Sequence, residues 1–340
     1  MPVPNPAAQA QARTENTSLR GGTDVLYSFA TTIISGWNYP KPIFSYVPTA
    51  EQRQPFLTWA KANGFDGIDL ADTWINWFAM SDADLREFRD QVQAAGLVVS
   101  GLNPYRSIIV KHESAARNEE KLEQSIAACR ILGCRFLGLP LSVPFPAVWK
   151  SERERAERQL KLARDRDYSD EDFAEAARKI ARLADIAAKD DIQLTIELHD
   201  DGMTDTSASI LKLLSLIDRK NVGANPDLQN LYRVPYATED WKHALVALAP
   251  VTNYWHVKSN SKVFILSEDR SYSLRASMRD GDIDHRWALT VLSTHGFDGW
   301  LVIESGGGDG MYTAAADRAY MADLVDNWLP LVKGTRWPVS

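Results

Sequence analysis

The sequence predicts an α/β protein whose strands and helices form a (β/α)8 barrel. Short apolar stretches alternate with segments of helical periodicity, eight of each, along almost the whole chain. Strands that alternate with helices form a parallel sheet, and eight such pairs close into a barrel. The phrase Gly-Phe-Asp-Gly occurs at 64–67 and again at 296–299, each time between an expected helix and an expected strand. This repetition supports a fold built from equivalent units.

The expected strands are short runs of apolar and β-branched residues, bounded by glycine, asparagine or aspartate. The run Leu194-Thr-Ile-Glu-Leu-His is typical, and the acidic loop that begins at Asp200 ends it. In chain order, strands are expected at 25–29, 65–70, 97–102, 134–139, 194–199, 221–227, 253–258 and 299–304.

The expected helices are recognised by apolar residues at helical spacing and by residues that cap helix ends. Ser81 and Ser169 stand before acidic first turns, as N-caps do. Gly64, Gly96 and Gly133 follow helical segments, where a glycine commonly ends a helix. The helices are expected at 49–63, 81–95, 114–132, 169–189, 206–216, 238–248, 284–294 and 313–329.

Four segments lie outside this regular alternation. We expect one catalytic barrel domain over 25–332, preceded by a flexible arm over 1–24 and followed by a short C-terminal tail over 333–340. The insertion at about 140–168 contains a charged run, which predicts a solvated helix or a mobile excursion more than a lid or a subunit contact. A long loop is expected at about 259–282.

Composition excludes several classes of protein. The net charge of −7 argues against a nucleic-acid partner. No apolar run approaches the roughly 20 residues that a membrane span needs, and the first residues have no apolar core of a secretory signal. The only cysteines, Cys129 and Cys134, form no disulfide framework and fit a reducing cytoplasm. The 11 tryptophans favour aromatic walls in a binding site, or a subunit interface.

Acidic and imidazole side chains stand at the C-terminal ends of four successive expected strands. They are Glu197, Asp227, His256 and Glu304. Barrel enzymes carry their chemistry at this end, and neighbouring strands are about 4.8 Å apart, so the four groups can converge. Three carboxylates in one pocket repel one another unless a cation lies between them. Oxygen-rich ligation with one imidazole suits Mn²⁺ or Mg²⁺, with Fe²⁺ or Co²⁺ as alternatives, whereas salt-bridged structural residues are the competing interpretation.

Two further residues share faces with these candidates. His199 lies two positions after Glu197 on the same face of its strand, so it is a candidate general base, or a residue that orients Glu197. Lys258 shares a face with His256 and could neutralise an enolate oxygen or pair with a carboxylate. Gly306-Gly-Gly308 is a weak phosphate-loop signal, and Asp280–Asp284 is expected as a turn and helix N-cap.

The same motifs resemble a known superfamily, the xylose isomerase-like TIM barrels, which include sugar isomerases and epimerases. The resemblance implies one divalent metal, usually Mn²⁺, held by Glu197, Asp227, His256 and Glu304. It covers the chain from the first expected strand to the last expected helix. It is carried by IELHD at 196–200, NPD at 225–227, HVK at 256–258, GDID at 281–284 and GFDGWLVIES at 296–305.

Two departures from the ketose epimerases narrow the resemblance. Asn230 stands where epimerases often have a histidine, and His199 stands where they commonly lack one. Together with a Trp-rich stretch and long loops, these features look like the α subunit of bacterial C-glycoside deglycosidases. Such enzymes cleave the carbon–carbon bond between a 3-oxo-glucoside and a flavonoid-type aglycone, and they work with a small β subunit. The resemblance implies substrate contacts from Trp74, Trp77, Tyr105, Asn225 and Asn230.

The sequence therefore leaves open which of several functions this barrel performs. The favoured one is a metal-dependent carbon–carbon lyase acting on 3-oxo-C-glycosides, in which His199 removes a proton beside a metal-bound ketone and the aglycone is eliminated. The alternative is a ketose isomerase or 3-epimerase, and a non-catalytic sugar-binding barrel is a weaker one. Endonuclease IV-like barrels share the fold, but the acidic charge argues against them. The expected partners are a glycoside or sugar and a small β subunit or further copies of the chain.

Overall fold

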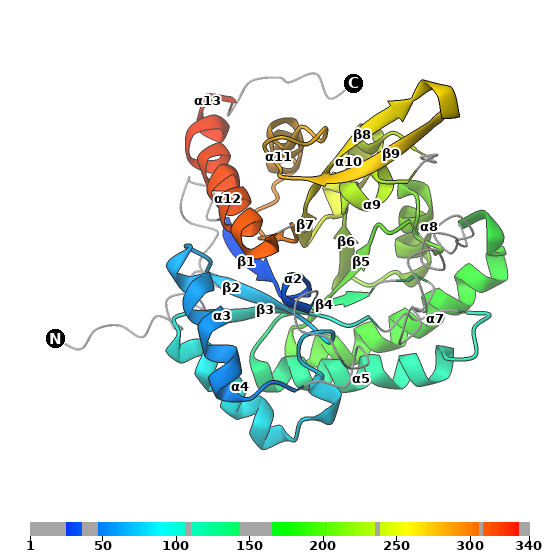
Figure 1. Cartoon of the computed structure of the whole chain (residues 1–340). Coiled ribbons are helices and arrows are strands. Elements are labelled where there is room, and N and C mark those ends of the chain that lie inside the picture. Colours follow the sequence, from blue (N-terminus) through cyan, green and yellow to red (C-terminus); the bar gives the residue numbers. More distant parts are fainter. Residues whose placement is uncertain are drawn as a thin grey trace.

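Eight parallel strands form a nearly closed barrel in the part of the chain that the structure describes (Figure 1). The structure is a computed structural model, and it describes residues 25–35, 47–105, 110–139, 141–142, 165–200, 202–234, 239–305 and 309–332. The barrel strands are β1 (Leu26–Ala30), β2 (Gly67–Ala71), β3 (Val98–Asn103), β4 (Phe136–Leu139), β5 (Gln193–Glu197), β6 (Val222–Asn225), β7 (Trp255–Val257) and β10 (Trp300–Ile303). The predicted fold class is thereby confirmed.

The strand order brings the ends of the last four barrel strands together. Hydrogen-bonded neighbours follow the order β6-β5-β4-β3-β2-β1-β10-β7. A parallel bridge between Ala224 and Thr252 joins β6 to the segment just before β7, and the backbone amide of Asn253 donates to the Ala224 carbonyl oxygen over 3.1 Å. The C-terminal ends of β5, β6, β7 and β10 therefore lie side by side.

Helices surround the barrel (Figure 1). Most of the main helices begin after a residue whose side chain caps the first turn. Thr49, Ser81, Ser169 and Thr206 each accept a hydrogen bond from the third helical residue in a complete capping box. Gly133 follows a helix with a φ of 73°, a conformation that a glycine adopts without strain. The main helices are α3 (Ala50–Ala62), α4 (Asp82–Ala94), α5 (Ala115–Leu132), α7 (Asp170–Ala187), α8 (Ser207–Ile217), α10 (Trp241–Leu248), α11 (His285–Thr294) and α12 (Gly310–Asp323).

Three segments differ from the sequence expectation. The expected loop at 259–282 contains an antiparallel hairpin of β8 (Ser259–Ile265) and β9 (Arg270–Ala276), and the side chains of β9 alternate in polarity. A short helix, α9 (Leu228–Tyr232), follows β6 and is too short for a periodic signal. The last expected helix changes to a π-helical turn at Leu324 and continues as α13 (Leu329–Val332).

The remaining expectations concern segments that are only partly described. Four of the expected segments lie outside the described residues: the arm at 1–24, the tail at 333–340, the charged run within 140–168 and the glycines at 306–308.

Other expectations fall on described residues. Asp284 caps α11, as expected for the turn that precedes it. Cys129 and Cys134 are buried free thiols. Among the described helices, none combines the length and the apolar character that a membrane crossing requires.

Candidate metal centre

The four residues expected as metal ligands lie together at the C-terminal end of the barrel. Glu197, Asp227, His256 and Glu304 each offer one donor atom, and these atoms all lie within 4.8 Å of one another. Three of the side chains are buried and Glu304 is half-buried. The adjacency of β5, β6, β7 and β10 explains the convergence, because parallel strands present equivalent ends at the same rim.

Local backbone structure holds each of these residues in place. Glu197 ends β5, and Asp227 is the N-cap of α9, where it accepts a hydrogen bond from the Asn230 amide. The backbone amide of Glu304 donates to the Val257 carbonyl oxygen over 3.0 Å. The backbone amide of His256 donates to Asn225 Oδ1 over 2.8 Å, which holds β7 against the end of β6. Each donor atom is thus carried by a strand end or a capped helix.

Asn225 and Asn230 make hydrogen bonds that support the acidic group. Asn230 is fully buried, and its Nδ2 lies 3.1 Å from Glu197 Oε1 and 3.0 Å from Asp227 Oδ2. Asn225 is also buried and holds the backbone of His256. Both amides therefore position the acidic group from inside the protein, and the substrate contact expected of them stays a prediction.

Lys258 supplies positive charge within the acidic group. Its Nζ lies 2.6 Å from Asp227 Oδ2 and 2.8 Å from Glu304 Oε2. Burial would lower the pKa of Lys258, but the charges of Asp227 and Glu304 outweigh that effect and raise it. Of the two roles that the sequence left open, pairing with carboxylates is the one present in the structure.

The carboxylates differ in how the surroundings affect their ionisation. Burial would raise the pKa of Glu197, but the contact with the His256 imidazole and the charge of His199 outweigh it and lower the pKa to about 2. For Asp227, burial has the largest effect and raises the pKa to about 6, although Lys258 opposes it. Glu304 is held well below its ordinary pKa, because Lys258 and His256 outweigh its burial.

The donor set fits a divalent metal ion. His256 Nδ1 lies 3.2 Å from Glu304 Oε2 and 3.6 Å from Glu197 Oε1, so this nitrogen faces the carboxylates. It is buried and makes no hydrogen bond. Three carboxylates and one imidazole nitrogen around a common point suit oxygen-preferring divalent ions. The group formed by Glu197, Asp227, His256 and Glu304 could therefore hold such an ion, and we call it the metal group.

His199 lies beside the metal group and is held by an acidic neighbour. Its Nδ1 is 3.3 Å from Asp200 Oδ1. Arg233, at the end of α9, binds the same carboxylate with two nitrogens, and its Nε lies 2.9 Å from Asp200 Oδ2. Burial would raise the pKa of Asp200, but the charges of Arg233 and His199 outweigh it and lower the pKa to about 2. An ionised Asp200 thus faces one nitrogen of the His199 imidazole.

Tyr105 follows β3 and faces the same region. Its amide donates to Asp72 Oδ1 over 3.1 Å, and its side chain is half-buried. Burial raises the pKa of the Tyr105 phenol, and the nearby charges of Glu304 and Glu197 raise it further. The charges of these carboxylates reach Tyr105, and the substrate contact expected of it stays a prediction.

Trp74 and Trp77 do not form the aromatic wall that the sequence suggested. Trp74 is buried and makes edge-on ring contacts with Phe56 of α3 and Phe88 of α4. Trp77 is also buried, and its Nε1 donates to Ser125 Oγ of α5 over 3.2 Å. Both indoles pack between the barrel and its outer helices, so core packing explains them better than substrate contact.

Sequence reasoning overlooked Asp69 and the roles of Asp200 and Arg233. Asp69 is buried on β2, and its Oδ2 lies 3.9 Å from His256 Nε2. Its signal was a single carboxylate inside an otherwise apolar strand, which is uncommon without a partner. Arg233 carried no comparable signal, because nothing in the sequence places it against Asp200.

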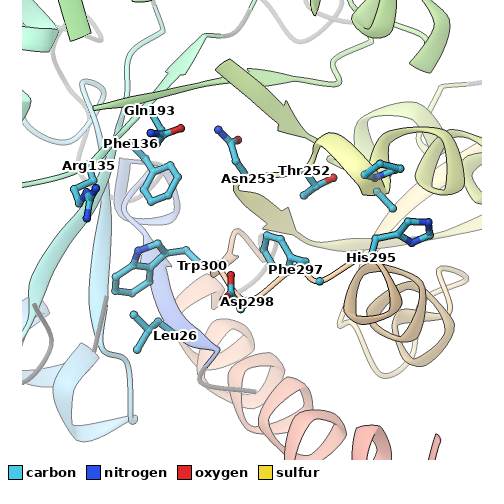
Figure 2. A pocket seen from close by; sticks show the side chains of 14 residues that line it. Leu26, Arg135, Phe136, Gln193, Thr252, Asn253, His295, Phe297, Asp298 and Trp300 are labelled. Carbon is cyan, nitrogen blue, oxygen red and sulfur yellow. The ribbon is translucent and has the colours of Figure 1, made fainter. Parts of the chain in front are cut away.

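A separate cavity lies at the opposite end of the barrel (Figure 2). It has a volume of about 390 Å³ and is lined by residues at or before the first positions of several strands, including Leu26, Gln193 and Trp300. Its lining contains no member of the metal group. This end of a barrel ordinarily contributes to stability and not to chemistry, so the metal group remains the candidate site.

Comparisons with solved structures agree with the fold. A xylose isomerase-like TIM barrel protein from Mycobacterium smegmatis, in complex with magnesium, is 23% identical with a TM-score of 0.74, covering 90% of this chain and 97% of that one. A probable 3-DHS dehydratase from Bacillus anthracis is 16% identical (TM-score 0.64; 88% and 99% covered). An L-ribulose 3-epimerase is 17% identical (TM-score 0.65; 92% and 100% covered). At these identities the likeness concerns the fold alone.

Comparison of sequences identifies the family. No protein with a curated description matches the sequence. The xylose isomerase-like TIM barrel family matches it over residues 57–324, well over half of the chain. The matched residues include the strands that carry the metal group. The chain therefore belongs to the xylose isomerase-like TIM barrel family.

Proposed function

We propose that this protein is a divalent-metal-dependent lyase that acts on a 3-oxo-C-glycoside. His199 removes the proton from the carbon next to the ketone, and the aglycone is then eliminated. The observation that carries the proposal is the imidazole of His199, held by Asp200 beside the metal group with Nδ1 and Oδ1 3.3 Å apart. A base so placed can act on a substrate that the metal group binds.

The residues of the chain have separate roles in this reaction. An ion bound by the metal group would polarise the ketone and lower the pKa of the neighbouring C–H bond. Asp200 faces Nδ1 of His199 at 3.3 Å and favours the tautomer that carries a proton there, which leaves the lone pair on Nε2 to take the substrate proton. Arg233 keeps Asp200 ionised and oriented. Lys258 balances the charge of Asp227 and Glu304.

The bond changes in the proposed elimination are balanced. The electron pair of the broken C–H bond forms a carbon–carbon double bond in the sugar. The bond from the sugar to the aglycone breaks, and the aglycone carbon leaves with its electron pair and takes a proton. No oxidant or reductant is consumed. Mn²⁺ is the ion we expect, and a small β subunit is the partner we propose.

A second candidate is epimerisation of a free ketose, which begins with the same proton removal. The epimerase is favoured by the positions of Glu197 and Glu304. Both carboxylates lie within 3.6 Å of His256 Nδ1, so two acidic groups face the same point in the site. The core positions of Trp74 and Trp77 also remove one argument for a large planar aglycone. The fold accommodates both kinds of reaction, since one similar structure is named an epimerase and another a probable dehydratase.

The two candidates are separated by their products. Purified protein loaded with Mn²⁺ is incubated with a 3-oxo-C-glucoside and with ketohexoses, with and without a candidate small subunit. Release of free aglycone supports the lyase, and epimer formation without release would replace it by the epimerase.

Replacing His199 tests the proposed base. His199→Phe should abolish turnover while Mn²⁺ binding, measured by calorimetry, stays within a few-fold of the original. The matched control is His295→Phe, because His295 is exposed at the other end of the barrel and should leave turnover unchanged. Loss of metal binding in His199→Phe would instead make His199 a support of the metal group.

A further inference from the structure

A row of buried polar side chains runs through the barrel interior to the metal group. Ser28 Oγ lies 2.7 Å from Ser100 Oγ, and Ser100 Oγ lies 2.9 Å from the Tyr254 hydroxyl. That hydroxyl donates to Asp69 Oδ2 over 2.9 Å, and Asp69 Oδ2 faces His256 Nε2 at 3.9 Å. Ser28 lies on β1, Ser100 on β3 and Asp69 on β2, whereas His256 lies on β7 and Tyr254 directly precedes that strand. All five side chains are buried.

The two ring nitrogens of His256 face different acids. Nδ1 faces Glu197 and Glu304 of the metal group, whereas Nε2 faces Asp69 on the other side of the ring. The Tyr254 ring lies edge-on to the imidazole at 5.8 Å between centroids and limits its rotation. An ionised carboxylate only accepts hydrogen bonds, so it favours the tautomer in which Nε2 carries the proton.

We propose that Asp69 is a positioning residue of the metal centre. It fixes the ring orientation and the tautomer of His256, so that Nδ1 presents its lone pair to a divalent ion. This inference rests on the proposed metal-dependent function. Carboxylates in this position behind a histidine ligand typically affect metal affinity about 10- to 100-fold.

The surroundings of Asp69 argue against a purely structural role. The carboxylate is almost fully buried, and its Oδ1 makes no hydrogen bond. A buried carboxylate with an unsatisfied oxygen is unfavourable for stability, and an apolar residue would fill the same space at a lower energetic cost. The glycine at position 101 also leaves space for the Asp69 carboxylate. A Cβ atom on Gly101 would lie 2.9 Å from the Tyr254 hydroxyl and 3.3 Å from Asp69 Oδ2.

The test measures metal binding and the imidazole tautomer without relying on turnover. Asp69→Asn keeps the shape of the side chain but loses the charge that selects the tautomer. We expect its Kd for Mn²⁺, from calorimetry, to rise about 10- to 100-fold. In the Mg²⁺-loaded protein, nitrogen NMR of labelled histidine should show the Nε2–H form of His256 in the original chain and a mixture in the variant. Asp69→Glu should restore part of the affinity.

Control variants separate positioning from general damage to the barrel. Ser28→Ala removes a hydroxyl from the far end of the same row and should leave the Mn²⁺ affinity within a factor of two. Circular dichroism and thermal unfolding check that each variant folds. Equal Mn²⁺ affinity and an unchanged tautomer in folded Asp69→Asn would overturn the inference about Asp69.

The outcomes also distinguish this inference from the proposed function. If the original chain binds Mn²⁺ in an Asp69-dependent manner but cleaves no glycoside, the positioning role stands and the lyase falls. If aglycone release is observed and Asp69→Asn binds Mn²⁺ normally, the lyase stands and the positioning role falls. If the original chain binds no divalent ion, both are overturned.

Discussion

Replacing Lys258 by methionine would leave the buried Asp227 and the half-buried Glu304 of the metal group without their ammonium partner. Lys258 Nζ lies 2.6 Å from Asp227 Oδ2 and 2.8 Å from Glu304 Oε2, and its side chain is only 11% exposed. At an effective dielectric constant of about 20, each contact contributes about 6 kcal/mol before desolvation. Removal of one partner from a buried ion pair typically costs about 3–5 kcal/mol in total. We therefore expect Lys258→Met to lose about 3–5 kcal/mol of unfolding free energy in the presence of a chelator.

A divalent ion should recover much of this loss, because it supplies positive charge at the same carboxylates. At an ion concentration about 100 times its Kd, binding stabilises the folded state by about 2.7 kcal/mol. The assay is urea unfolding of both proteins at pH 8, in EDTA and in Mn²⁺. The cost in EDTA should be smaller at pH 5, where Asp227, with a pKa of about 6, is mostly protonated.

The matched control is Lys262→Met in the β8–β9 hairpin. The Lys262 ammonium lies 4.4 Å from the Tyr232 ring centroid, and it pairs with no carboxylate of the metal group. A partly exposed contact of this kind is worth about 1 kcal/mol or less, and Mn²⁺ should not affect its loss. If Lys258→Met is as stable as the original chain in EDTA, or if Mn²⁺ stabilises both equally, the argument from charge balance is refuted.

Two further predictions concern core packing and pH. Trp74→Phe should cost about 1–3 kcal/mol of stability, seen in thermal unfolding, because a smaller ring leaves space between Phe56 and Phe88; an altered KM would instead indicate substrate contact. Burial raises the pKa of Asp317 from 3.8 to about 6, although its hydrogen bond with Ser305 opposes this. The stability associated with protonated Asp317 is present below about pH 4 and lost as pH rises through 6. Relative to the original, Asp317→Asn should therefore gain about 2 kcal/mol between pH 4 and 7 in urea unfolding, and a pH-independent difference would contradict this.

Local signals were sufficient for most of the barrel. Ser81 and Ser169 mark helix starts because their hydroxyls accept the amide of the third helical residue, an interaction within four residues of chain. Gly133 marks a helix end because its φ is positive. The hairpin at 259–276 was overlooked because its length suggested a loop, although Tyr272 and Leu274 alternate with serines. The short α9 helix gave no periodic signal.

The sequence by itself determined the barrel and the meeting of Glu197, Asp227, His256 and Glu304. Strand alternation and the common rim of parallel strands are local and topological rules, and they suffice to bring successive strand ends together. A residue pattern says which strand carries a side chain and on which face it lies.

Only the tertiary structure decided which other residues join this group and which do not. It brought Asp69 of β2 to His256, joined Arg233 to Asp200, and placed Trp74 in the core. These contacts depend on barrel closure, on register and on side-chain packing between segments far apart in sequence; the Tyr254–Asp69 hydrogen bond joins residues 185 positions apart. No local pattern encodes such neighbours, because their proximity exists only when the whole barrel has formed.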